Sequence, residues 1–330
     1  MSALAAPTIE QVRAAQERIK GRASRTPLNP IHAGGLAWIK LENLQPIGSF
    51  KLRGALNKML AVPREDLAGG AYTASAGNMA QGVAFAARML GVPATALVPD
   101  SAPRAKTDAV ERLGGNVERV PYDEWWKVMQ AGGREGAPGL FVHPFADTDV
   151  MAGNGTIALE ILEDRPDVKA VLVPWGGGGL TCGIAAGMRA LNPAVRVFAV
   201  EVEGAAPLTA SRAAGQPVTI DNQRSFIDGM GGRGVFPEMW PLAQLLVADV
   251  LTVTVQQVAD AVRLLAQRGR VVAEGAGAAP VAAAIAYGAR LAPNKGSVVC
   301  VVSGGNIDAS VLSQILAGNT PAWRPNSSHQ

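Results

Sequence analysis

Hydrophobic and polar positions along the 330-residue chain follow two periods, one typical of strands and the other of helices. An opening helix is predicted over 8–20, where Thr8 and Gln11 form a capping-box pattern. From residue 70, β-rich runs alternate with helical segments: AYTAS, ATALVP and NVERVP are each followed by a predicted helix, over 78–90, 103–113 and 123–130. This alternation predicts a parallel sheet with right-handed crossovers.

The same alternation returns after a stretch at 131–150 that is rich in glycine and proline and is expected to be irregular. The predicted elements are a helix from Thr156, strand VLVPW, a helix from Leu180, strand VRVFAVEVE, helices over 256–267 and 277–287, strand SVVCVVSGG and a helix from Asp308. Because 330 residues exceed the usual size of one core, the two blocks predict two doubly wound α/β lobes.

The segment LENLQPIGSFKLRGA, residues 41–55, joins a predicted strand over 36–41 to a helix that begins near Lys51. A lysine there lies close to the partial positive charge of the first-turn N–H groups and is partly desolvated. Both effects lower the pKa of its amine and favour a nucleophile that forms a Schiff base. A lysine considered alone is more often a solvated surface residue.

A second segment, PWGGGGL at 174–180, follows an apolar strand and precedes a helix. Consecutive glycines let backbone N–H groups converge, and the helix N-terminus favours an anion, so this loop predicts a phosphate site. The alternatives are a flexible loop and a nicotinamide-dinucleotide fingerprint. The spacing of Gly176, Gly178 and Gly183 does not match that fingerprint, although Glu201 lies at a suitable distance.

Two further loops follow predicted strands: SAGNMAQ at 75–81 and SGGN at 303–306. The first opens a helix, where unsatisfied N–H groups can bind an anion, although a simple helix cap would explain one of its polar residues. SGGN alone is a weak signal.

Together these segments resemble the pyridoxal-phosphate-dependent threonine and serine dehydratases, the fold-type II family that includes serine racemase and the tryptophan synthase beta subunit. The resemblance covers nearly the whole chain. It implies two doubly wound open-sheet lobes with the cofactor in the cleft between them. The large cofactor-binding domain would comprise residues 1–53 and 147–330, and a small mobile domain residues 54–146.

The resemblance also implies the residues of the site. Lys51 would be the catalytic residue, Phe50 would pack on the cofactor ring, Asn78 would contact its phenolic oxygen, and Ser303 would hydrogen-bond its pyridine nitrogen. The full cofactor set is Phe50, Lys51, Asn78, Gly176, Gly177, Gly178, Gly179, Leu180, Glu274, Ser303 and Gly304. The substrate set is Ser75, Ala76, Gly77, Asn78, Met79 and Gly231. Taken alone, Glu274 could simply open the following helix, and the DG of DGMGG at 228–232 could be a turn.

Departures from the family pattern carry information. Met79 stands where histidine is commonest, and Ala76 stands where the racemase branch has a serine, so two-base racemisation is disfavoured and α-proton removal rests on Lys51 alone. Glu201 matches the family's cation site, but Pro207 replaces an aspartate, so a divalent-metal site is not favoured. Gly231 and its neighbour replace bulkier residues, which leaves room for a larger substrate side chain.

The reaction expected is β-elimination of water from L-threonine or L-serine, which yields a 2-oxo acid and ammonia. A dehydratase for phenylserine or 3-hydroxyaspartate is the alternative within the same chemistry. Two readings from other classes remain open: an NAD(P)-dependent oxidoreductase that uses the glycine loop, and a non-catalytic ligand sensor of the same fold.

Composition bears on membrane insertion, nucleic-acid binding and the state of the two cysteines. The chain is 48% hydrophobic, but no apolar run reaches the roughly 18 residues of a membrane helix, and no secretory signal is visible. The net charge is +3, the 30 basic residues are scattered along the sequence, and only 5% of residues are aromatic, so no nucleic-acid partner is expected. Cys182 and Cys300 match no metal spacing and predict free buried thiols. We expect a cytoplasmic enzyme that acts on a small amino acid and, from the resemblance, forms a homodimer.

Overall fold

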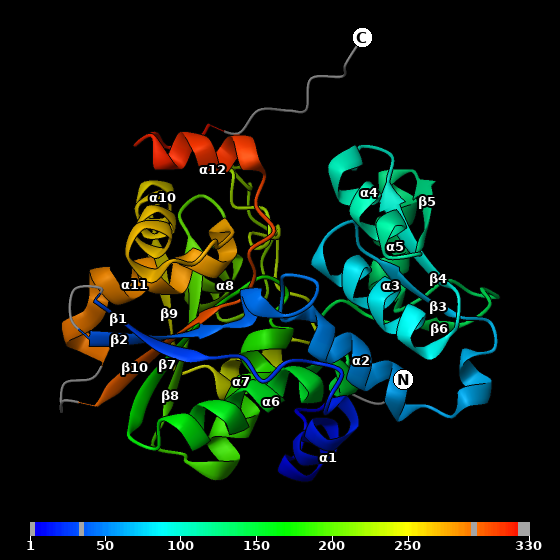
Figure 1. The fold of residues 1–330 in the computed structure, drawn as a ribbon, viewed down its shortest axis with the longest axis horizontal. Coiled ribbons are helices and arrows are strands. Elements are labelled where there is room, and N and C mark those ends of the chain that lie inside the picture. The colour runs from blue at the N-terminus through cyan, green and yellow to red at the C-terminus, as the bar shows by residue number, and fades with distance from the viewer. Residues whose placement is uncertain (1–3, 33–35, 292–295, 323–330) are drawn as a thin grey trace.

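Two β-sheets organise the computed structural model, which describes residues 4–32, 36–291 and 296–322 (Figure 1). The larger sheet has the order β1-β2-β10-β7-β8-β9, in which only β1 is antiparallel to its neighbour. Its strands are β1 (Leu28–His32), β2 (Leu36–Leu41), β10 (Ser297–Val302), β7 (Val168–Pro174), β8 (Arg196–Val202) and β9 (Asp249–Val253).

The larger sheet is covered by helices on both faces. On one side lie α10 (Val255–Leu264) and α11 (Gly275–Leu291), and on the other α6 (Thr148–Asp164) and α7 (Gly179–Leu191), with α1 (Ile9–Ile19) packed on α6 (Figure 1). Alternate residues of β10 enter different cores: Cys300 packs with the α11 side, whereas Val299 and Val301 pack with the α7 side. A strand buried on both faces explains the continuous apolar run SVVCVV.

The smaller sheet is parallel throughout, with the order β5-β4-β3-β6. Its strands are β5 (Asn116–Val120), β4 (Ala94–Pro99), β3 (Ala71–Ala74) and β6 (Leu140–Phe141), and its helices are α3 (Asn78–Leu90), α4 (Arg104–Arg112) and α5 (Tyr122–Ala131). Between the two sheets lies α2 (Lys51–Ala61), which packs on α3 and on α6 (Figure 1). This helix therefore links both parts of the molecule.

The predicted fold class, two open α/β sheets, is confirmed, and several boundaries are refined. The helix predicted from Thr156 begins at Thr148, because the Asp147 carboxylate caps it by accepting from the Val150 N–H at 3.0 Å. Five elements were not predicted: the strands β1, β6 and β9 and the short helices α8 (Pro207–Ala214) and α9 (Trp240–Leu246). The predicted domain boundary at residue 53 falls inside α2, and the division and mobility of the domains stay predictions.

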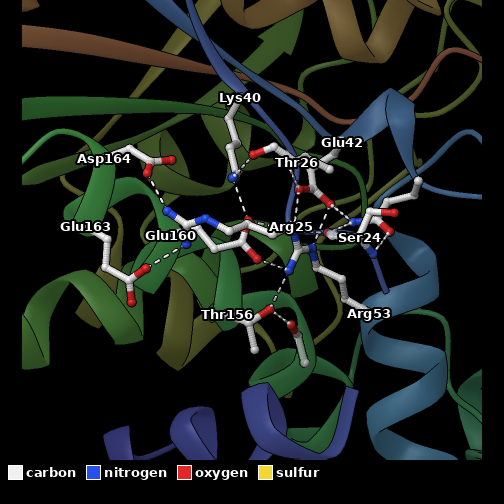
Figure 2. Close-up of polar contacts among 12 residues, drawn as sticks. Ser24, Arg25, Thr26, Lys40, Glu42, Arg53, Thr156, Glu160, Glu163 and Asp164 are labelled. Atoms are coloured by element: carbon white, nitrogen blue, oxygen red, sulfur yellow. Dashed lines mark hydrogen bonds and ion pairs between the residues drawn. The ribbon is translucent and has the colours of Figure 1, made fainter. Parts of the chain in front are cut away.

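A buried ionic cluster ties α2 to the larger sheet (Figure 2). Arg53 is 1% exposed and pairs with Glu42 at 2.8 Å, just after β2, and with Glu160 on α6 at 2.7 Å. Lys40 on β2 pairs with Glu160 at 2.5 Å. Burial alone would raise the pKa of Glu42, but the charge and hydrogen bonds of Arg53 bring that pKa below its usual value. Two cations and two carboxylates thus anchor the first turn of α2.

Candidate active site

Lys51 is the first residue of α2 and is half-buried. Its Nζ donates to the carbonyl oxygen of Pro144 at 2.5 Å and lies 5.0 Å from the centroid of the Phe50 ring. Burial lowers the pKa of the amine to about 8, and the negative charge of Glu274 opposes that shift. An appreciable fraction of the amine is therefore neutral near pH 7 to 8, as a nucleophile or base requires.

The glycine loop lies between β7 and α7, and its glycines are required by space and by backbone conformation. A side chain at Gly177 would overlap the ring of Phe145, and a Cβ at Gly179 would lie 2.5 Å from the Phe145 carbonyl oxygen. Gly178 has φ +90°, a conformation that favours glycine. The loop is closely packed rather than open, and the first-turn N–H groups of α7 are donors for an anion.

A segment that the sequence analysis treated as irregular, residues 143–147, joins these two parts of the site. The carbonyl of Pro144 holds the lysine amine, and Phe145 covers the glycine loop. Only Val142 separates the segment from β6, so it lies at the carboxyl edge of a parallel sheet, where ligand-binding loops gather. A strand predicted at Leu140–Phe141 would have placed residues 143–147 at the site.

A hydrogen-bonded group of three side chains connects the smaller sheet to the larger one. Asn78, the first residue of α3, donates through Nδ2 to both carboxylate oxygens of Glu274, at 3.0 and 3.2 Å. Its Oδ1 accepts from Asn306 at 2.8 Å. Burial and the nearby charge of Asp228 raise the pKa of Glu274 to about 7, although Asn78 acts in the opposite direction. The Asn78 amide is thereby held in one orientation.

The SGGN loop after β10 closes the remaining side. Ser303 is buried, and its carbonyl oxygen accepts from the Phe50 N–H at 3.0 Å. A Cβ at Gly304 would lie 2.5 Å from Glu274 Oε1. The loop therefore lies directly against the start of α2 and against Glu274.

These residues fit a cofactor that carries a phosphate and an aldehyde. They comprise a tightly packed glycine loop at a helix N-terminus and a half-buried amine bonded to the carbonyl of Pro144, whose chain neighbour Phe145 lies against that loop. The family model for "Pyridoxal-phosphate dependent enzyme" matches residues 19–304. This chain belongs to the pyridoxal-phosphate-dependent enzymes. The cofactor of the family is pyridoxal phosphate.

Individual relatives agree with the family. An L-threonine ammonia-lyase of Geobacter sulfurreducens is 42% identical over 313 residues, which cover 92% of this chain and 77% of the relative. An L-threonine ammonia-lyase of Thermotoga maritima is 38% identical over 320 residues, which cover 94% and 78%. The structure of maize serine racemase superposes with a TM-score of 0.87 at 32% identity, covering 95% of this chain and 98% of that one.

The predicted substrate loop of this pyridoxal-phosphate enzyme lies between β3 and α3. The Ser75 hydroxyl is half-buried and accepts from the Gly77 N–H at 3.3 Å, and Ala76 packs against the apolar core of the smaller sheet. Gly231 has φ +93°, and a Cβ there would lie 3.0 Å from Ala205. Conformation and space therefore account for glycine at this position without a substrate.

Three of the predicted site residues have side chains that do not face the cluster of Lys51, Asn78 and Glu274. Met79 is 1% exposed within the apolar core of the smaller sheet, and Leu180 is buried in the core beneath α7, so only its backbone N–H is available to an anion. The Glu201 carboxylate accepts from the N–H groups of Leu208 and Thr209, both at 2.8 Å, and so caps α8.

Within residues 4–32, 36–291 and 296–322, no group of three or more histidine, cysteine, aspartate or glutamate side chains is arranged to hold a metal ion. Over the same residues, every helix is too short or too polar to cross a membrane. Both cysteines are buried free thiols, and burial raises the pKa of Cys182 to about 12.

Proposed function

We propose that this enzyme eliminates water from L-threonine or L-serine and releases a 2-oxo acid and ammonia. The observation that carries the proposal is the setting of Lys51, a half-buried amine with a pKa of about 8 that touches the same segment as the glycine loop. The names of the two ammonia-lyase relatives, at 42% and 38% identity, support L-threonine as the first substrate to test.

The proposed division of labour follows the geometry. The N–H groups of Gly176–Gly179 and of the first turn of α7 would hold the cofactor phosphate, and Lys51 would hold the cofactor aldehyde through its amine. Asn78, whose amide is oriented by Glu274 and Asn306, is the residue that would contact the phenolic oxygen of the cofactor. The loop at 75–77 binds the substrate carboxylate with backbone and hydroxyl donors.

Bound pyridoxal phosphate supplies an electron-withdrawing system that stabilises negative charge on the substrate α carbon. Once a substrate amine has taken its place on the aldehyde, the freed Lys51 Nζ would take the α proton, and the Pro144 carbonyl oxygen would accept a hydrogen bond from the resulting ammonium. The C–O bond at the β carbon would then break, and the hydroxyl would leave as water with the proton that the Lys51 ammonium returns. Hydrolysis of the released enamine then gives the 2-oxo acid and ammonia.

Racemisation is the second candidate, because the maize structure with the same fold is a serine racemase. A racemase needs an acid–base group on each face of the α carbon, and Ala76 offers only a methyl group where a second one is expected. We therefore expect no D-serine from L-serine, and chiral chromatography of the reaction mixture checks this.

The experiment that tests the function is ammonia release from L-threonine, L-serine, their D forms, phenylserine and 3-hydroxyaspartate. Lys51→Ala should lower turnover at least about a thousandfold and abolish the absorbance of the bound cofactor at ~420 nm, because the attached amine and the base are both lost. Lys20→Ala, at an exposed lysine, should retain both signals.

Each alternative gives a different result in this assay. Preference for phenylserine or 3-hydroxyaspartate would identify a dehydratase for bulkier substrates. Cofactor binding without ammonia from any of these amino acids would instead support the non-catalytic sensor.

A cytoplasmic location and a homodimeric assembly complete the proposal. Two free buried thiols are consistent with a reducing compartment. Light scattering on the purified protein measures the assembly directly, and a mass of one chain at working concentration would contradict the dimer.

A further inference from the structure

His143 lies at the centre of the turn that contacts both Lys51 and the glycine loop. Its side chain is 6% exposed. Ring Nδ1 accepts from the N–H groups of Phe145 at 3.2 Å and Ala146 at 2.8 Å, while Nε2 lies 3.2 Å from the carbonyl oxygen of Met129. One ring nitrogen therefore accepts and the other donates.

This arrangement requires a neutral ring with its proton on Nε2, because an imidazolium would have no lone pair to accept from the two N–H groups. Burial lowers the pKa of His143 to about 4. The hydrogen bond to Met129 and the charge of Asp147 oppose that shift, whereas the charge of Lys51 adds to it. The ring is thus neutral at the pH where Lys51 titrates.

The turn contacts the site at two places, through the Pro144 carbonyl and through Phe145. The carbonyl of Pro144 accepts from Lys51 Nζ at 2.5 Å. Phe145 lies against the glycine loop, where its ring excludes any side chain at Gly177. His143 accepts from the N–H groups of Phe145 and Ala146. Because the Phe145 N–H and the Pro144 carbonyl belong to one planar peptide unit, this bond also determines the direction of the carbonyl.

We propose that His143 is a positioning residue for Lys51: its neutral ring holds the turn over 143–146 so that the Pro144 carbonyl keeps a hydrogen bond to the lysine amine. This inference rests on the proposed function only in that Lys51 is taken as the base. A carbonyl accepts more strongly from an ammonium than from a neutral amine, so the contact raises the basicity that burial lowers. The same turn keeps the amine aligned with the glycine loop.

Two substitutions separate the roles of the ring nitrogens. Asparagine places its amide oxygen near the position of Nδ1, so His143→Asn should retain the capped turn. Glutamine places its amide nitrogen near Nε2, so His143→Gln should retain the bond to Met129 and lose the cap. His32→Asn, at an exposed histidine, is the control.

The measurement is the pKa of the Lys51 amine in the full chain freed of cofactor, obtained by competitive acetylation across pH and mass spectrometry of the Lys51 peptide. In His143→Gln we expect this pKa to fall below the wild-type value, because the carbonyl contact is lost. His143→Asn and His32→Asn should match the wild type. Equal values in all four proteins, or equal losses in both His143 variants, would overturn the proposal.

A second measurement needs no variant that alters the site. Nitrogen-15 spectra of the wild-type histidine rings, assigned with His32→Asn and His329→Asn, should show His143 neutral with its proton on Nε2 from pH 5 to 8. A ring that titrates near ~6.5 or carries its proton on Nδ1 would reject the role. Neither measurement uses turnover, so failure of the threonine assay and failure of this inference are distinguishable.

Discussion

At the scale of single residues, two opposing effects determine the amine of Lys51. Burial lowers its pKa, and the carboxylate of Glu274 raises it, with a net value of about 8. Glu274 itself has its pKa raised to about 7, chiefly by burial, so its charge is mostly present when Lys51 titrates. The reactivity of the lysine is therefore coupled to a side chain 223 positions away, whose own charge depends on pH.

Replacing Glu274 with glutamine isolates the charge. Glu274→Gln retains an acceptor for Asn78 but removes the negative charge, so the pKa of Lys51 should fall below its present value of about 8. Attachment of pyridoxal phosphate requires the neutral amine, so the rate at which cofactor-free protein regains absorbance at ~420 nm should reach half its maximum at lower pH. An unchanged midpoint would show that Glu274 does not act on the amine through charge.

At the scale of elements, the position of α2 depends on the buried cluster around Arg53 (Figure 2). The guanidinium bonds to groups from three parts of the chain: Glu42 after β2, Glu160 and Thr156 on α6, and the carbonyl of Ser24. Removing one partner of a buried ion pair leaves an uncompensated charge, which is far costlier than losing an exposed pair.

Two arginine-to-methionine variants compare these cases. Arg53→Met should lower the free energy of unfolding by about 3–5 kcal/mol, because Glu42 and Glu160 lose a shared partner. Arg25→Met removes the exposed pairs with Glu163 and Asp164 and should cost at most about 1 kcal/mol. Urea denaturation measures both, and equal costs would mean that the cluster contributes no more than a surface pair.

At the scale of the whole molecule, the site is assembled across both sheets. Asn78 begins α3 beside the smaller sheet, whereas Glu274 directly precedes α11 and Ser303 directly follows β10 of the larger sheet. A further ion pair, Lys106 to Asp228 at 2.5 Å, joins α4 to the loop after residue 227 on the molecular surface. A ligand held between these parts binds the folded chain and not the unfolded one, so it must stabilise the fold.

Cofactor removal should therefore lower the melting temperature. Pyridoxal phosphate at one hundred times its dissociation constant should stabilise the wild type by about 2.7 kcal/mol, and Lys51→Ala should gain less because the covalent attachment is lost. NAD(P) is the control and should give no shift. A shift with NAD(P) and none with pyridoxal phosphate would support the oxidoreductase alternative instead.

Local patterns were enough for the elements that carry strong periodicity or a defined cap. The capping box of Thr8 and Gln11, the bounds 78–90 of α3 and the alternation of strand and helix all follow from interactions between residues near in sequence, and each is present in the structure. Short elements were not predicted, because a two-residue strand such as Leu140–Phe141 is defined by its pairing with β3 rather than by its own residues.

The sequence by itself determined the two-sheet α/β architecture, the start of α2 at Lys51 and the packed glycine turn before α7, since these depend on period, caps and backbone freedom. Only the tertiary structure decided that Met79 is a core residue, that Glu201 caps a helix, and that the turn at His143 holds the lysine amine. Those outcomes depend on burial and on contacts between distant segments, and burial is also what brings the lysine pKa to about 8.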